Sequence, residues 1–257
     1  MPPFQLLGAR GPVLGLIHGF PLDATLWDEQ RALTSHLRLL TFDLPGFGAH
    51  RAATPATDLA AFAEHVRAVL DAAGVERVIL GGLSMGGYIA FECWRRFPQR
   101  IEALLLCDTR AEADGDEARA NRARGLAAMR EGRRTELLEG MFDKLLAPQS
   151  RAAGRPAAAT RAMMHRASDA AISAALAALR DRADATPTLA TITVPTLIVC
   201  GEEDALTPPP IARAMHEAIR GSELALVADA GHLAPLEQPL AFNAAVARWL
   251  ATHHLAR

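Results

Sequence analysis

The chain has 257 residues, with 27 Lys or Arg against 29 Asp or Glu, which gives a formal net charge of −2 at pH 7. The length suits one large domain or a domain with an insertion, and a hydrophobic content of 50% excludes extensive disorder. The near-neutral charge gives no reason to expect a nucleic acid as partner. Three cysteines without a Cys-x-x-Cys pair indicate neither a disulfide framework nor a zinc site.

The N-terminal residues lack the basic region and the long apolar run of a secretory signal. No stretch of about 18 uncharged apolar residues is present, so we expect no membrane-spanning helix and no membrane partner. The sequence therefore predicts a cytoplasmic protein, which agrees with its few cysteines.

Short apolar runs alternate with helical patterns along most of the chain. The predicted strands are residues 13–17, 37–42, 75–80, 103–107, 196–200 and 224–227, and the predicted helices are 59–73, 87–97, 210–219 and 240–250. Runs that are apolar throughout are typical of strands covered on both faces. The alternation predicts an α/β fold, with a mostly parallel sheet and helices on both faces.

One long segment departs from this alternation. Between residues 111 and 188 there is no candidate strand, and helical patterns occur at 117–130, 134–146, 157–167 and 169–182. We predict a core domain made of residues 1–110 and 189–257, with an all-helical lid of residues 111–188 inserted into it. A lid is favoured over a helical subdomain that only buries more core, because the insertion follows a strand end, where chemistry gathers.

Ser84 lies in a Gly-x-Ser-x-Gly motif between a predicted strand and a predicted helix. Glycines at 82 and 86 permit a sharp turn that exposes the serine hydroxyl, and the amides at the helix start point toward developing negative charge. The motif therefore predicts a nucleophile. The alternative is a glycine-rich turn that only permits close packing.

A serine hydroxyl needs a base, and the base needs an acid that orients it. His232 follows the last predicted strand and is the candidate base, whereas we interpret its rival His18 as a structural or oxyanion-loop residue. Asp204 follows the predicted strand 196–200 and is the candidate acid, which gives the chain order serine, acid, histidine. The alternative acids are Glu202, Glu203 and Asp108.

A tetrahedral intermediate needs hydrogen-bond donors for its oxyanion. The amide of Met85, next to the candidate nucleophile, is one predicted donor. Pro21 has no N–H and favours an extended backbone at the residue before it, so the second predicted donor is the amide of Phe20. The alternative is that this loop is a simple turn that ends a strand.

These motifs resemble the serine-nucleophile branch of the α/β-hydrolase superfamily. The matching segments, in the order of that family, are residues 18–21, 43–48, 82–87, 201–204 and 231–232. Within the family, residues 18–24 and Trp27 are most similar to small carboxylesterases and to 3-oxoadipate enol-lactone hydrolases. The short N-terminus predicts that the first edge strands of the family are abbreviated here.

The resemblance implies a carboxylic ester hydrolase that works through Ser84, His232 and Asp204 and an acyl-enzyme. The same residues also suit hydrolysis of an enol-lactone or of a carbon–carbon bond, perhydrolysis and amide hydrolysis. A non-catalytic ligand-binding protein on this fold is the alternative of a different class. No nucleotide-binding or metal-binding motif is present, so we expect no cofactor and no metal. The expected partner is a small-molecule ester or lactone, and the expected state is a monomer or homodimer.

The predicted lid carries a charge pattern that bears on the substrate. Thirteen arginines and ten acidic residues lie between residues 110 and 182, as do four of the seven methionines. Most of these arginines are expected on a solvated face, but one could pair with a substrate carboxylate. An enol-lactone acid requires such a partner, whereas a neutral ester does not.

Overall fold

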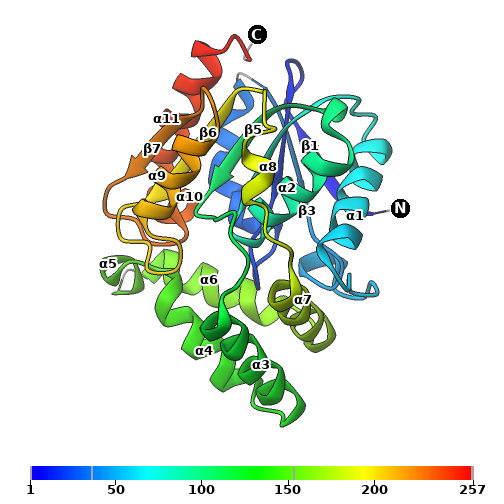
Figure 1. The fold of residues 1–257 in the computed structure, drawn as a ribbon, viewed down its shortest axis with the longest axis vertical. Helices are drawn as coiled ribbons and strands as arrows, with labels where there is room; N and C mark the ends of the chain where they lie inside the picture. Colours follow the sequence, from blue (N-terminus) through cyan, green and yellow to red (C-terminus); the bar gives the residue numbers. More distant parts are fainter. Residues whose placement is uncertain (1, 36, 153, 256–257) are drawn as a thin grey trace.

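The computed structural model describes residues 2–35, 37–152 and 154–255. The strands of this part form one seven-stranded sheet in the order β1-β3-β2-β4-β5-β6-β7 (Figure 1). Only β1 runs antiparallel to its neighbour, and the other pairs that join these strands are parallel. The predicted α/β fold with a mostly parallel sheet is confirmed.

Each predicted apolar run is a strand in the structure. The strands are β1 (Phe4–Leu7), β2 (Val13–Ile17), β3 (Arg38–Phe42), β4 (Val78–Leu83), β5 (Ile101–Cys107), β6 (Thr196–Gly201) and β7 (Glu223–Val227). β2, β4 and β6 are buried along their whole length, which agrees with sequences that contain no charged residue and, apart from Thr196, no polar side chain. The edge strand β1 was not predicted, because its half-exposed residues form no continuous apolar run.

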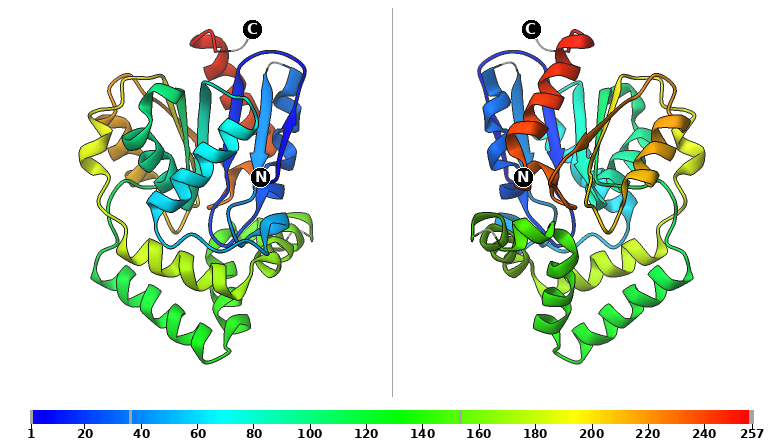
Figure 2. Two further views of the ribbon diagram at one scale, coloured as in Figure 1. Left: turned by 90° about the vertical axis from the view of Figure 1, so that its right-hand side faces the viewer. Right: turned by 90° about the vertical axis from the view of Figure 1, so that its left-hand side faces the viewer.

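Helices lie on both faces of the sheet (Figure 2). Outside residues 116–181 the helical elements are η1 (Ala24–Ser35), η2 (Gly48–His50), α1 (Leu59–Ala72), α2 (Met85–Arg96), η3 (Pro98–Arg100), α8 (Thr186–Leu189), α9 (Pro209–Ala218), α10 (Ala234–Glu237) and α11 (Pro239–Thr252). α2 packs on α1 and on β4, whereas α11 packs on η1 and on β7. α1 begins at Asp58, whose carboxylate accepts a hydrogen bond from the amide of Ala61 at 2.7 Å.

Five of the six helices described between β5 and β6 form what we call the helical block. They are α3 (Asp116–Arg130), α4 (Arg134–Leu145), α5 (Pro148–Ala152), α6 (Gly154–Arg166) and α7 (Asp169–Asp181). The block lies at one end of the molecule, opposite the end that carries the C-terminal helix (Figures 1 and 2). No helix in the described part of the chain is long and apolar enough to span a bilayer.

Contacts of two arginines lie at the junction between the helical block and the sheet domain. Arg166 of α6 donates to the carboxylate of Asp23, which follows β2 and is 1% exposed, at 2.6 Å. Arg182, just after α7, pairs with the buried Asp114 and lies over the ring of Tyr88 at 4.3 Å. Arg166 itself is partly exposed, but Asp23, Asp114 and Arg182 are buried, so loss of their partners leaves a buried charge uncompensated. These contacts therefore stabilise the position of the block.

Candidate active site

Ser84 lies at a sharp turn between β4 and α2, with φ +54° and ψ −112°. A Cβ at Gly82 would lie 2.2 Å from the carbonyl group of Gly86, and a Cβ at Gly86 would lie 2.3 Å from the carbonyl oxygen of Ile17. Only glycine fits at these two positions, which explains the motif around the serine. Ser84 itself is half-buried between fully buried neighbours, so its side chain is presented at the surface of a cavity.

His232 and Asp204 lie in contact although they are 28 residues apart. Nδ1 of His232 and Oδ2 of Asp204 are 2.8 Å apart, and both side chains are buried. Oδ1 of Asp204 accepts hydrogen bonds from the amides of Leu206 and Thr207, and the hydroxyl of Thr207 donates to Oδ2. Both oxygens of the carboxylate therefore accept hydrogen bonds, which fixes its orientation.

Burial acts to raise the pKa of Asp204, but the charge of His232 and hydrogen bonds from His232 and Thr207 outweigh it and lower the pKa to about 2. An ionised carboxylate facing Nδ1 of His232 requires the proton of the imidazole on that nitrogen. Nε2 then carries the free lone pair. The side-chain hydrogen bonds of His232 go to Asp204 and Thr207, and the Ser84 hydroxyl has no hydrogen-bond partner among the described residues.

None of the rival acids contacts His232 in the described part of the chain. Glu202 and Glu203 are exposed, and the carboxylate of Glu203 accepts a hydrogen bond from Gln149 of α5 at 2.8 Å. Asp108 lies directly after β5 with φ +44°, and its Oδ1 accepts from the amide of Gly201 at 2.8 Å. Of the acids weighed from the sequence, Asp204 is the one that contacts His232.

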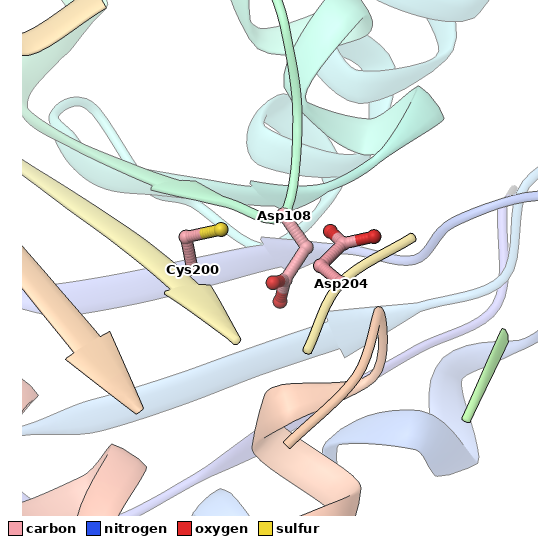
Figure 3. Close-up of side chains that lie close together, drawn as sticks. All are labelled: Asp108, Cys200 and Asp204. Carbon is pink, nitrogen blue, oxygen red and sulfur yellow. The ribbon is translucent and has the colours of Figure 1, made fainter. Parts of the chain in front are cut away.

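Asp108, Cys200 and Asp204 form a buried cluster in which one ligand-type atom from each lies within 4.8 Å of the others (Figure 3). Burial, and then the charge of Asp204, raise the pKa of Asp108 well above its usual range, and burial also raises the pKa of the Cys200 thiol. That thiol donates to the carbonyl oxygens of Gly201 and Thr207. Asp108 and Cys200 are therefore buried side chains that pack beside Asp204, the acid that contacts His232.

His18 holds the loop that follows β2. The amide of Leu44 donates to Nε2 of His18 at 3.0 Å, so the ring proton is on Nδ1, which donates to the carbonyl of Gly19 at 2.9 Å. Burial lowers the pKa of His18, which keeps the ring neutral. This matches the structural role that the sequence favoured for His18 over a role as base.

Phe20 and Met85, the two predicted oxyanion donors, line the same cavity as Ser84. Within the described residues, neither backbone amide donates a hydrogen bond to a protein acceptor. Buried amides without a partner are rare in folded proteins. The two N–H groups are therefore available to an acceptor that occupies the cavity.

The cavity has a volume of about 590 Å³, within the range of small-molecule sites. Its walls come from the strand ends near Ser84 and His232 and from α3, α4 and α7 of the helical block. Of the four methionines in the block, Met141 lines the cavity, whereas Met163 and Met164 are 1% exposed and pack in the core.

Glu237 is a part of the site that the sequence did not indicate. Its Oε1 accepts from the amides of Gly231 and Leu233, on either side of His232, at 3.0 and 3.1 Å. Its Oε2 accepts from the amide of Ala147, just after α4, at 2.8 Å. One buried carboxylate thus joins the histidine loop to the helical block. The only sequence signal is its position five residues after His232.

A serine at a strand-to-helix turn, with an acid and a histidine after later strands, is typical of hydrolases built on a parallel α/β sheet. The comparison with known sequences agrees with this class. The chain belongs to the Alpha/beta hydrolase family, whose pattern it matches over residues 16–245. The resemblance inferred from the motifs is confirmed.

Three known proteins illustrate the relationship. A thermophilic esterase from Thermogutta terrifontis, solved with malate bound, is 35% identical, with a TM-score of 0.93 and coverage of 98% of this chain and 93% of that one. The pimeloyl-[acyl-carrier protein] methyl ester esterase of Neisseria meningitidis is 29% identical over 252 residues, 89% of each chain. The enol-lactonase from Burkholderia xenovorans LB400 shares the fold, with a TM-score of 0.88, 24% identity and coverage of 96% and 95%. Family and relatives mark the chain as a hydrolase.

Proposed function

We propose that the protein is a serine hydrolase that cleaves small carboxylic esters, or lactones as cyclic esters, through an acyl-enzyme. In this proposal Ser84 is the nucleophile, His232 is the general base and acid, and Asp204 orients the imidazole. The amides of Phe20 and Met85 stabilise the oxyanion. Residues 111–188 act as a lid over a core domain of residues 1–110 and 189–257.

The reaction follows from the proton positions in the site. With the Nδ1 proton directed at Asp204, Nε2 of His232 takes the hydroxyl proton of Ser84 as the serine oxygen attacks the ester carbonyl. The tetrahedral intermediate collapses, and Nε2 gives that proton to the departing alcohol. Water then enters, loses a proton to Nε2 and attacks the acyl carbon. The second tetrahedral intermediate releases the carboxylic acid as Nε2 returns the proton to the oxygen of Ser84.

The observation that carries the proposal is the 2.8 Å contact between Nδ1 of His232 and Oδ2 of Asp204, beside a cavity that Ser84 and His232 both line. A protein that only binds a ligand has no need for a buried carboxylate that fixes an imidazole tautomer. It also has no need for a serine held at a φ of +54°, a conformation that costs about 1–3 kcal/mol. The esterases among the relatives support the same reaction.

The test is hydrolysis of a short p-nitrophenyl ester by the parent and by Ser84→Ala. We expect kcat to fall by about 10³-fold or more, because the remaining groups hold no nucleophile. The matched control is Ser35→Ala, an exposed serine whose hydroxyl faces the carbonyl of Ala32 in η1. Turnover by Ser84→Ala within tenfold of the parent would overturn the proposal.

A further inference from the structure

The cavity wall carries more positive than negative charge. Five cationic side chains line it, Arg110, Arg122, Arg124, Arg133 and Lys144, against two carboxylates, Asp114 and Glu136. The chain as a whole has a net charge of −2, so this excess of positive charge is local to the cavity. A cleft lined by one sign of charge concentrates ligands of the opposite sign.

Among these cations, Arg110 is connected by hydrogen bonds to the turns that carry Ser84 and Asp204, through its neighbour Thr109 and through its own guanidinium. The residue before it, Thr109, donates from its hydroxyl to the carbonyl of Ser84 at 2.8 Å. Nη2 of Arg110 donates to the carbonyl of Leu206 at 2.7 Å, and the amide of Leu206 donates to Oδ1 of Asp204 at 2.8 Å. These contacts place the guanidinium on the wall between the nucleophile turn and the turn that carries the acid.

Of the four arginines on the cavity wall, Arg122 and Arg133 have carboxylate partners, whereas Arg110 and Arg124 have none among the described residues. Arg124 is exposed and donates to the side-chain oxygen of Asn121, which leaves Arg110 as the half-buried arginine without a carboxylate partner. The carboxylate of Asp114 pairs with Arg122 and with Arg182, and Arg133 pairs with Glu131 and with Glu136. Within the described residues no carboxylate lies within ion-pair distance of Arg110, which is half-buried and bonded to one backbone carbonyl. Its other N–H groups are left for a ligand, and the guanidinium fork matches a carboxylate in shape and charge.

We propose that the cavity takes esters or lactones that carry a second, ionised carboxylate, and that Arg110 binds this carboxylate during turnover. Half-esters of dicarboxylic acids are the simplest substrates of this class. The inference rests on the proposed ester hydrolysis and narrows its substrate class. Charge-assisted hydrogen bonds to a half-buried arginine favour such substrates over neutral esters by about 10- to 100-fold in kcat/KM.

The experiment compares monomethyl esters of the C4 to C7 dicarboxylic acids with the corresponding dimethyl esters, in the parent and in Arg110→Gln. The readout is the ratio of kcat/KM for the half-ester to that for the neutral diester, measured at low and high salt. We expect a ratio of at least tenfold at the best chain length in the parent, which falls as salt is raised. Arg110→Gln should lower that ratio at least tenfold.

Arg119→Gln is the matched control, because Arg119 is exposed on α3 of the same block and does not line the cavity. It should leave the ratio within twofold of that of the parent. A parent ratio near one, or an equal loss of both activities in Arg110→Gln, would overturn the inference while leaving the proposed ester hydrolysis intact. Failure of the parent to hydrolyse any ester would instead overturn the proposed function.

Discussion

Asp204→Asn tests whether one carboxylate sets the proton position of the candidate base. Oδ1 of Asp204 accepts two backbone N–H bonds, from Leu206 and Thr207, so the carbonyl oxygen of an asparagine remains on those donors. Its NH₂ group then occupies the Oδ2 position, 2.8 Å from Nδ1 of His232. A donor there forces Nδ1 to become the acceptor and moves the ring proton to Nε2, which can no longer take a proton from Ser84.

The expected loss in kcat is about 10³- to 10⁴-fold, since the wrong tautomer removes the base and leaves the rest of the site in place.

The effect of Asp204→Asn on the free energy of unfolding should also depend on pH. The pKa of Asp204 is lowered from 3.8 to about 2, so its ionisation contributes about 2 kcal/mol above pH 3.8. That contribution is lost as pH falls toward 2. The gap in Tm between parent and Asp204→Asn should therefore narrow in acid.

The assay is p-nitrophenyl ester hydrolysis by stopped-time absorbance, with thermal unfolding of both proteins from pH 3 to pH 8. Glu203→Gln is the matched control, because this neighbouring carboxylate is exposed and contacts Gln149 rather than the histidine. Its turnover should stay within about twofold of that of the parent. An equal loss in Glu203→Gln, or nearly full activity in Asp204→Asn, would refute the reasoning.

Two further substitutions test buried carboxyl groups around the site. The pKa of Asp108 is raised in the folded state, so ionisation of this carboxyl group favours unfolding as pH rises above 3.8. Asp108→Asn should therefore raise the Tm above that of the parent by an amount that grows with pH. A Tm difference that is constant with pH contradicts this. Glu237→Gln should lower the free energy of unfolding by about 2 kcal/mol, or the Tm by about 4–8 °C, because an amide donor replaces the oxygen that accepts from Ala147. An unchanged Tm contradicts the link between the histidine loop and the helical block.

The sheet could be predicted because strands that are buried on both faces have continuous apolar sequences. The six apolar runs became β2 to β7, and the patterns with helical spacing became long helices. η1, residues 24–35, was not predicted, because its 3₁₀ winding does not repeat with the spacing of an α-helix. β1 was missed because a four-residue edge strand carries little signal.

For the site, the candidate residues could be predicted from the sequence, but which of them contact one another is seen only in the structure. Asp108 and Asp204 both follow strands, and only the three-dimensional arrangement shows which of them faces His232. Glu237 could not be predicted, since its role depends on Ala147, 90 residues away, folding back onto the histidine loop. The sequence likewise could not single out Arg110 among thirteen arginines, because which of them line the cavity and which pair with carboxylates are properties of the fold.

The central claim is that His232 makes the hydroxyl of Ser84 reactive. The most direct measurement is peptide mass spectrometry after exposure to a p-nitrophenyl alkylphosphonate, which transfers its phosphonyl group to an activated serine and releases p-nitrophenol. We predict one adduct per chain, on the peptide that contains Ser84, and labelling at least 10³-fold slower in His232→Ala. An adduct on a different residue, or equal labelling rates in parent and variant, would contradict the account.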